Sequence, residues 1–302
     1  MTGTEETPLK PERRDSMNRR RFLKNAGLAA FAATVPWTLS VTPDSLFHLF
    51  RGRRLTPGES FSLLKLERVL PGYILPESNQ FSTDRFKMQY ALFNLYDIAF
   101  VQAGDFLFQR IPSGKQATFR FHLNRYANVG LTGSGEKYSY ILRGSAVCAD
   151  NLFATPATWE CESKIARSFR STPMPGTAFS WTGAYESGSI RVSTHGKSVV
   201  KNIALPDLTW KWGLISVVQK MAENVIETAE FSSLDEMDIV YARQAIARSA
   251  DRPVKYGEDH ITFRVYDLVG DGIIPTVYWV DQHNRVVFII SGMEAWLLSN
   301  QA

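Results

Sequence analysis

The chain has 302 residues, of which 44% are hydrophobic and 12% aromatic, and its formal net charge is +4. This length and apolar content suffice for one large or two small globular domains. Residues 1–39 hold seven of the 34 basic and four of the 30 acidic residues, which leaves 27 against 26 in the rest of the chain. That mixed balance excludes the strongly basic face expected of a nucleic-acid-binding protein.

The first feature in chain order is a basic motif followed by an apolar run, 26–35. The motif consists of Arg19, Arg20, Phe22, Leu23 and Lys24. It resembles the twin-arginine signal of bacterial proteins that cross the inner membrane already folded. An apolar run of about 10 to 14 residues is too short for a permanent membrane helix but suits a signal sequence. A basic N-terminal arm or an ordinary amphipathic helix is the alternative.

The resemblance implies export by the twin-arginine translocase to the periplasm or the extracellular space, with 1–40 as the signal segment. Cleavage after Ala32 and cleavage after Ser40 both stay open, as does translation from Met17. Retention of the signal as an anchor is also open. No other window approaches a membrane span, so no permanent span is expected.

A polar segment, 41–80, precedes a single β-rich domain, 81–302. Alternating apolar and polar residues, separated by turn residues, predict antiparallel hairpins. The turn of one hairpin is expected at Pro112–Lys115. The strands expected in the first part of the domain are 95–101, 104–110, 117–126, 138–148, 158–165, 178–185, 189–193 and 197–203.

A helical insertion is expected at 208–249. Apolar residues recur there at helical spacing from Leu214 to Val225, which predicts one helix with a single buried stripe. Ser233 with Glu236 has the spacing of a capping box and predicts a second helix that runs to about Ser249. The last expected strands are 260–268, 276–280 and 286–291, followed by a segment that reaches Leu298.

These patterns predict a mainly β (α+β) fold: a curved antiparallel sheet or open barrel with two helices inserted around 210–249. The end of the chain combines 278–281, a polar turn, 285–288 and a closing 296–298. It resembles envelope proteins built on a curved antiparallel sheet, the lipoprotein-carrier-like open barrels. The resemblance covers about the last 45 residues and implies a fold; no site residue is carried over from it.

The two cysteines, Cys148 and Cys161, fall in two expected strands joined by a loop. Export to an oxidising compartment favours a disulfide between them, and two unpaired buried thiols are the alternative. Alternation within 158–165 places Trp159, Cys161 and Ser163 on one face of the strand. Cys161 is therefore expected to be buried.

No local catalytic, phosphate-binding or metal-binding motif is present, so neither a cofactor nor a metal is expected and enzyme activity is left undecided. Strand pairing could bring a histidine and several carboxylates to the same end of the sheet, where they would form a general acid/base pair. A histidine within a strand could also line a cavity. Turn residues and solvated histidines are the simpler interpretation. The candidates for such a site are His122, His260, Asp267, Asp271 and Asp281.

Aromatic residues are the other candidates, because their faces bind apolar or CH-rich ligands. In a β protein of this size, a role in the core is the alternative for each of them. The binding candidates are Trp159, Trp181, Tyr185, Tyr278 and Trp279, and Trp210 and Trp212 belong to the same class.

Three functions are consistent with the sequence. The first is an envelope protein that binds an apolar or amphipathic ligand, such as a lipid, in a curved-sheet cavity. The second is a secreted hydrolase or lyase acting on an envelope or environmental polymer. The third is a structural or assembly partner without a small ligand.

Overall fold

The structure is a computed structural model, and all the residues that it describes belong to the compact unit Leu55–Ala302. The predicted signal segment and most of the polar segment lie outside the described residues. The described residues are 73–77, 81–94, 102–128, 137–167, 174–194, 196–202, 207–249, 251–256, 259–292 and 294–301.

The described residues form sixteen strands and one helix, α4 (Gly213–Glu223), which confirms the predicted mainly β fold. The strands are β1 (Phe86–Asn94), β2 (Gln102–Ser113), β3 (Gln116–Asn128), β4 (Lys137–Ala149), β5 (Pro156–Arg167), β6 (Phe179–Glu186), β7 (Ser189–Thr194), β8 (Lys197–Asn202), β9 (Leu208–Trp210), β10 (Thr228–Asp235), β11 (Ile239–Arg248), β12 (Arg252–Tyr256), β13 (Asp259–Gly270), β14 (Thr276–Val280), β15 (Val286–Ser291) and β16 (Glu294–Gln301).

The strands follow one path through the sheet, β8-β7-β6-β5-β4-β3-β2-β1-β16-β15-β14-β13-β11-β10-β9, and β12 pairs with β13 beside that path. β1 and β16 pair antiparallel, with Tyr90 opposite Leu298. The first and last described strands therefore join the two halves of the sheet. β9 and β10 form a parallel pair, Leu208 lying opposite Ser232.

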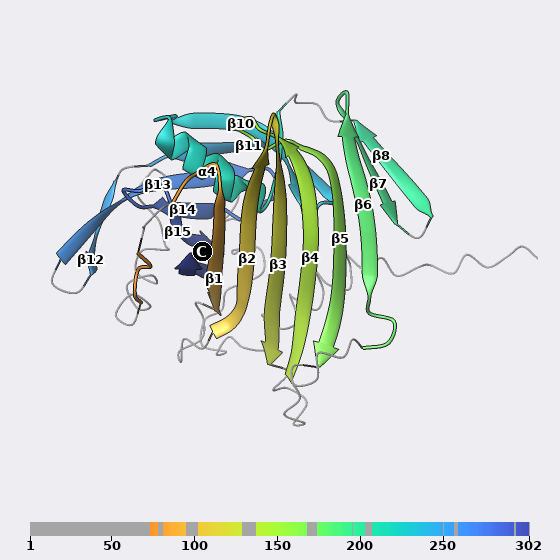
Figure 1. Cartoon of the computed structure of the whole chain (residues 1–302), viewed down its shortest axis with the longest axis horizontal. Helices are drawn as coiled ribbons and strands as arrows, with labels where there is room; N and C mark the ends of the chain where they lie inside the picture. The colour runs from red at the N-terminus through yellow and green to blue at the C-terminus, as the bar shows by residue number, and fades with distance from the viewer. Residues whose placement is uncertain are drawn as a thin grey trace, which may run out of the picture. The chain divides into compact units, whose positions relative to one another are not determined.

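The sheet curls, as the sequence predicts. Figure 1 shows β1–β5 upright, with β10, β11, β13 and β14 running across behind them. Trp159 on β5 donates a hydrogen bond from Nε1 to the carbonyl oxygen of Met237, between β10 and β11, at 2.9 Å. This bond joins distant parts of the strand order, so the sheet approaches closure there and β6–β8 extend beyond the contact.

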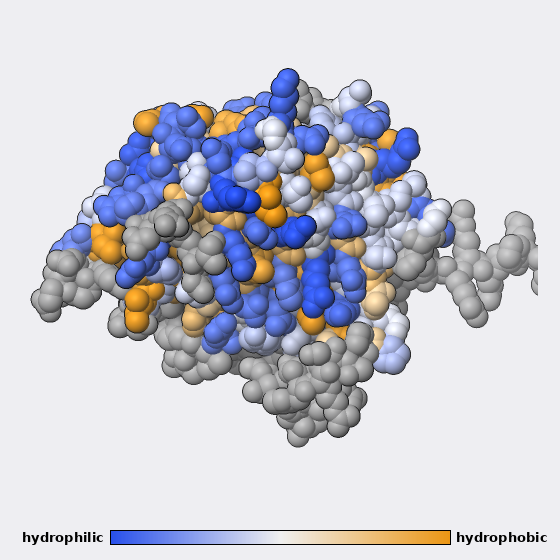
Figure 2. All heavy atoms as spheres, viewed as in Figure 1, coloured by the Kyte–Doolittle hydropathy of each residue, from blue (hydrophilic) through white to orange (hydrophobic). Residues whose placement is uncertain are grey.

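The two faces of β2–β5 differ as period-two alternation requires. Phe106 and Phe108 on β2 point inward and are fully buried. On the outward face, Arg143 of β4 lies opposite Glu162 of β5, an opposite-charge pair of the kind that stabilises neighbouring strands. The face seen in Figure 2 is largely hydrophilic, with scattered hydrophobic residues. The large apolar side chains of these strands therefore lie on the inner face, which is where a binding surface for an apolar group would be expected.

The predicted second helix is wrong: the end of β10, a turn and β11 occupy 233–248. Glu236 and Met237 have positive φ values of 49° and 63° and form the turn between these strands. Residues 231–234 of β10 are all buried, so this strand shows no alternation of apolar and polar residues. The Ser233 and Glu236 spacing matches a capping box, but Ser233 lies within β10 and Glu236 in the turn that follows it.

The other predicted elements agree closely with the structure. β14 and β15 have the predicted bounds, 276–280 and 286–291. Ser113 pairs with Gln116 across the predicted turn, where Gly114 has a φ of +63°. The predicted strand 95–101 lies outside the described residues, and β2 pairs with β1 instead. No helix among the described residues is long and apolar enough to cross a membrane.

Candidate functional site: an aromatic face, its cover and a charged rim

The inner side of β2 and β3 carries four buried phenylalanines, Phe106, Phe108, Phe119 and Phe121. The ring centroids of Phe106 and Phe108 are 5.8 Å apart, and those of Phe108 and Phe119 are 5.6 Å apart. We call these four side chains the aromatic face. Such a surface binds apolar groups with little loss of conformational entropy.

The segment 208–223, which comprises β9 and α4, covers the aromatic face, and we call it the cover segment. The Trp210 ring centroid lies 5.7 Å from that of Phe119 and 5.6 Å from that of Phe121. The Trp212 ring centroid lies 4.2 Å from that of Phe106. Gly213 permits this packing, because a Cβ atom there would lie 2.4 Å from Trp210 Nε1. The inner face is therefore filled by side chains of the cover segment.

Helix α4 is enclosed on nearly all sides, since most of its residues are buried and it contacts β9, β14 and β15. Gln219 Nε2 donates to Met88 Sδ on β1 at 3.2 Å. Arg264 Nη1 on β13 donates to the carbonyl oxygen of Ala222 at 2.8 Å. A helix with buried residues around most of its circumference needs such an enclosed position.

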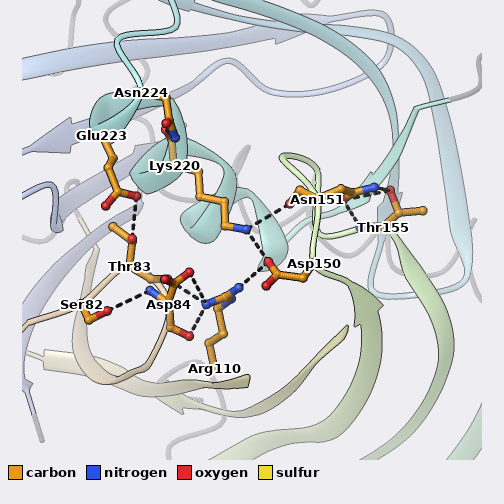
Figure 3. Close-up of polar contacts among 10 residues, drawn as sticks. All are labelled: Ser82, Thr83, Asp84, Arg110, Asp150, Asn151, Thr155, Lys220, Glu223 and Asn224. Atoms are coloured by element: carbon orange, nitrogen blue, oxygen red, sulfur yellow. Dashed lines mark hydrogen bonds and ion pairs between the residues drawn. The ribbon is translucent and has the colours of Figure 1, made fainter. Parts of the chain in front are cut away.

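Charged side chains hold the end of α4 at the rim of the sheet (Figure 3). Arg110 Nη2 on β2 donates to Asp150 Oδ1 at 2.7 Å, and Arg110 Nη1 lies 3.2 Å from Asp84 Oδ1. Lys220 Nζ on α4 donates to the same Asp150 Oδ1 at 2.6 Å. We call Arg110, Asp84, Asp150 and Lys220 the rim cluster. The Asp150 carboxylate therefore connects the cover segment to the sheet.

Three further hydrogen bonds fix the same corner. Arg110 Nη1 donates to the backbone carbonyl oxygens of Thr83, at 3.1 Å, and Asp84. Thr83 Oγ1 donates to Glu223 Oε2, in the last turn of α4, at 2.7 Å. The segment before β1 thus contacts both β2 and α4.

Burial differs sharply within the rim cluster. The Arg110 side chain is 1% exposed, whereas Asp84 is 71% and Asp150 27% exposed. The hydrogen bond from Lys220 lowers the pKa of Asp150, and the charges of Lys220 and Arg110 act in the same direction. The cation is fixed in the interior while its carboxylate partners reach solvent.

The cover segment contains buried polar atoms without a hydrogen-bond partner in the described part of the chain. Ser216 Oγ and Gln219 Oε1 lie one helical turn apart on α4, and Thr209 Oγ1 lies on β9. All three side chains are at most 1% exposed. Each unpaired buried polar group costs about 1–3 kcal/mol. We call the packing of the cover segment on the aromatic face the covered state. It is consequently less stable than its apolar contacts alone imply.

The predicted aromatic candidates lie in two separate regions. Trp159 on β5 and Trp181 on β6 are buried near the point where the sheet approaches closure, and Tyr185 on β6 is half-buried. Tyr278 and Trp279 are buried on β14, in the other half of the sheet. The four buried side chains belong to the core and Tyr185 packs against it. From the cover segment, the aromatic contacts with the aromatic face are made by Trp210 and Trp212.

The two cysteines are free thiols, so the predicted disulfide is wrong. On the β4–β5 pair, Cys148 lies opposite Pro156 and Cys161 lies opposite Gly144. Four residues of strand separate the two positions, about 13 Å, beyond the reach of a disulfide. Burial raises the pKa of both thiols. The predicted inward orientation of Cys161, with Trp159, is confirmed.

The predicted histidines do not lie together. His122 is on β3 and His260 on β13, six positions apart in the strand order, or about 29 Å along the sheet. His122 is half-buried on the outward face, between Leu107 and Arg143. Burial and the Arg143 charge lower its pKa. His260 is exposed opposite Lys255.

The predicted carboxylates are also separated. Asp271 precedes β14 and Asp281 follows it, so they lie at opposite ends of that strand. Asp271 is exposed and forms an ion pair with Arg243 at 2.6 Å. Asp267 accepts a hydrogen bond from Ser249 Oγ, and burial raises its pKa. Within the described residues, no three His, Cys, Asp or Glu side chains gather as they would around a metal ion.

Asp281 belongs instead to a buried ion pair. Its Oδ2 atom accepts a hydrogen bond from Arg285 Nε at 2.7 Å, and its Oδ1 atom accepts from the backbone N–H groups of His283 and Arg285 at 2.9 Å. Arg285 Nη1 donates to the carbonyl oxygens of Pro76 and Glu77, each at 2.9 Å. This pair fixes the β14–β15 turn and the segment before β1.

Sequence reasoning did not identify the rim cluster. One signal was present, because Arg110 follows Phe106 and Phe108 at the two-residue spacing of their buried side of the strand. A charged residue in a buried register requires partners. Its carboxylate partners lie 26 and 40 residues away and approach only after the sheet has paired.

No family model and no curated protein matches the chain. Among solved structures, the chain is similar to the crystal structure of a β-barrel-like protein with the domain of unknown function DUF1849 from Brucella abortus. The two are 10% identical with a TM-score of 0.48, over 72% of this chain and 97% of the other.

Proposed function

We propose that the protein binds an apolar or amphipathic ligand on the aromatic face, and that the cover segment moves aside to admit it. The observation that carries the proposal is the set of unpaired polar atoms in the cover segment, on Thr209, Ser216 and Gln219. Displacement would restore their hydrogen bonds with water. It would also expose the aromatic face, which an apolar ligand would then cover.

The strand pairing and side-chain contacts of the cover segment support this movement. β9 has three residues and lies at the end of the sheet, where it pairs on one side with β10. Its neighbour α4 is attached to the sheet mainly by side chains, through Lys220, Gln219 and the carbonyl oxygen of Ala222. Moving this segment therefore breaks few backbone pairs, and the main antiparallel ladders are retained.

The test is binding of N-phenyl-1-naphthylamine, a neutral probe that fluoresces in apolar surroundings. We expect saturable fluorescence with the native protein. Ser216→Ala removes one unpaired hydroxyl and should stabilise the covered state by about 1 kcal/mol, which lowers the apparent affinity about fivefold. Ser198→Ala, on exposed β8, is the matched control and should bind like the native protein.

Two results would contradict the proposal. One is the absence of saturable binding by the folded native protein. The other is a Ser216→Ala variant that unfolds at higher denaturant concentration yet binds the probe with unchanged affinity, because the cover segment would then not control access to the aromatic face.

We further propose that the protein acts in the cell envelope after export by the twin-arginine translocase. The motif around Arg19 and Arg20 supports this location. Replacing both with lysine should abolish recovery from the periplasmic fraction, whereas the same change at Arg13 and Arg14 should leave it unaltered. Equal export of both double variants would exclude the twin-arginine route.

A further inference from the structure

We propose that Arg110 binds the anionic group of an amphipathic ligand whose apolar part lies on the aromatic face. This inference rests on the proposed function and narrows the ligand to one with an apolar chain and a carboxylate or phosphate group. The site would comprise the Arg110 Nη2 edge and the adjacent Phe119 ring.

Arg110 is placed for this role by the strand that carries the aromatic face. It occupies the same inward row of β2 as Phe106 and Phe108, at the end of that row. It lies opposite Phe119 on β3, with the guanidinium carbon 5.9 Å from the centroid of the Phe119 ring. A fixed cation therefore stands where the apolar surface ends, which is the arrangement that an amphipathic anion requires.

The two edges of the Arg110 guanidinium have different partners. Nη1 donates to the backbone carbonyl oxygens of Thr83 and Asp84, which hold the side chain in place. Nη2 donates to the side chain of Asp150, which also binds Lys220 of the cover segment. When the cover segment moves, Lys220 moves with it and Asp150 loses one of its two cations.

Asp150 thus occupies the position of the ligand anion in the covered state. Its side chain is 27% exposed and that of Asp84 is 71% exposed, so both carboxylates can turn into water at small cost. Arg110, at 1% exposure, cannot follow them. A buried guanidinium needs an anionic partner, and its N–H groups match carboxylate and phosphate oxygens.

The test compares cis-parinaric acid with its uncharged methyl ester at pH 8, by fluorescence titration. The native protein should bind the acid at least tenfold more tightly than the ester, as a hydrogen-bonded charge contact implies. Arg110→Met should remove that preference while the ester still binds. Asp150→Asn should increase the affinity for the acid about threefold, because the competing anion is gone.

Arg248→Met is the control for loss of an arginine, because Arg248 forms ion pairs with Glu227 and Asp251 away from the rim cluster. It should retain the preference for the acid. Arg110→Lys keeps the charge but not the planar N–H edge, and it should retain only part of the preference. Circular dichroism establishes that each variant is folded.

The outcomes separate the two proposals. Equal affinity of the native protein for the acid and the ester, or an unchanged preference in folded Arg110→Met, would overturn the role of Arg110 while ligand binding stands. If Arg110→Met does not fold, unchanged acid binding in Asp150→Asn would overturn it. Absence of binding for both the acid and the ester, together with absence of N-phenyl-1-naphthylamine binding, would overturn the proposed function itself.

Discussion

Arg110 and Arg285 are both 1% exposed, yet their surroundings differ. Arg285 pairs with Asp281, four residues away in the same turn and 2% exposed. Arg110 pairs with Asp84 and Asp150, which come from two other segments and reach solvent. One arginine has a buried local partner, and the other has partners that can leave.

The exposed fraction of an arginine side chain does not by itself distinguish a structural ion pair from a binding site. A buried ion pair with a buried partner is a structural element, because breaking it strands a charge. A buried cation whose partners are partly in water can exchange them for another anion, since water solvates the carboxylates that it releases. The second arrangement is suited to binding, and the first to holding a turn.

The largest expected effect is at the structural pair. Arg285→Met should lower the free energy of unfolding by about 3–5 kcal/mol, because Asp281 then remains buried without its cation. Urea denaturation measures the change. Adding Asp281→Asn should recover part of the loss, and a double variant no more stable than the single one would contradict the role of the stranded charge.

Arg110→Met should cost less, about 1–3 kcal/mol, because hydrogen bonds are lost but the freed carboxylates are solvated. The same urea denaturation applies. Here the addition of Asp150→Asn should recover nothing. A recovery as large as that at Arg285 would show that the two arginines are equivalent and would end the comparison.

Asp150 provides a smaller, pH-dependent effect. Its pKa is lowered below the ordinary value of 3.8 by the Lys220 hydrogen bond, so the ionised form is favoured in the folded state. The resulting stabilisation is present above pH 3.8 and is lost as the pH falls through the lowered pKa. Asp150→Asn should remove this part of the acid destabilisation, worth less than about 1 kcal/mol. Parallel acid titrations of both proteins, followed by tryptophan fluorescence, measure the difference.

The smallest effect is kinetic and concerns Cys148. Burial raises its pKa, and the Arg110 charge opposes that shift. In a Cys161→Ala background, Lys220→Met should accelerate labelling of Cys148 by a thiol reagent about two- to fivefold, because the cover segment loses one ion pair. Lys201→Met, on exposed β8, is the control. An identical labelling rate in both variants would show that the rim cluster does not hold the cover segment.

Without reductant, the denatured native chain should titrate two thiols.

Sequence reasoning succeeded where local pattern decides structure. The strands 276–280 and 286–291 are short runs rich in β-branched and aromatic residues between turn residues, and their bounds were predicted. It failed at 233–249, because Phe231–Leu234 is buried on both faces and loses the alternation that marks a half-buried strand. For the candidate site, Trp210 and Trp212 are among the aromatic residues named from the sequence, whereas the five binding candidates lie in other parts of the sheet. The partners of Arg110 were not predicted, because only the pairing of β1 to β5 brings Asp84 and Asp150 near it.

The pairing of β1 with β16 also has a consequence for the order of events during synthesis. β1 lies between β2 and β16, and β16 ends at Gln301. While a ribosome is still adding Glu294–Gln301, β1 has an unpaired edge and the two halves of the sheet are not joined. Contacts about 200 residues apart slow folding. The two halves of the sheet therefore cannot be joined before Glu294–Gln301 have been synthesised, and any translocase that accepts only folded chains would have to wait for β16.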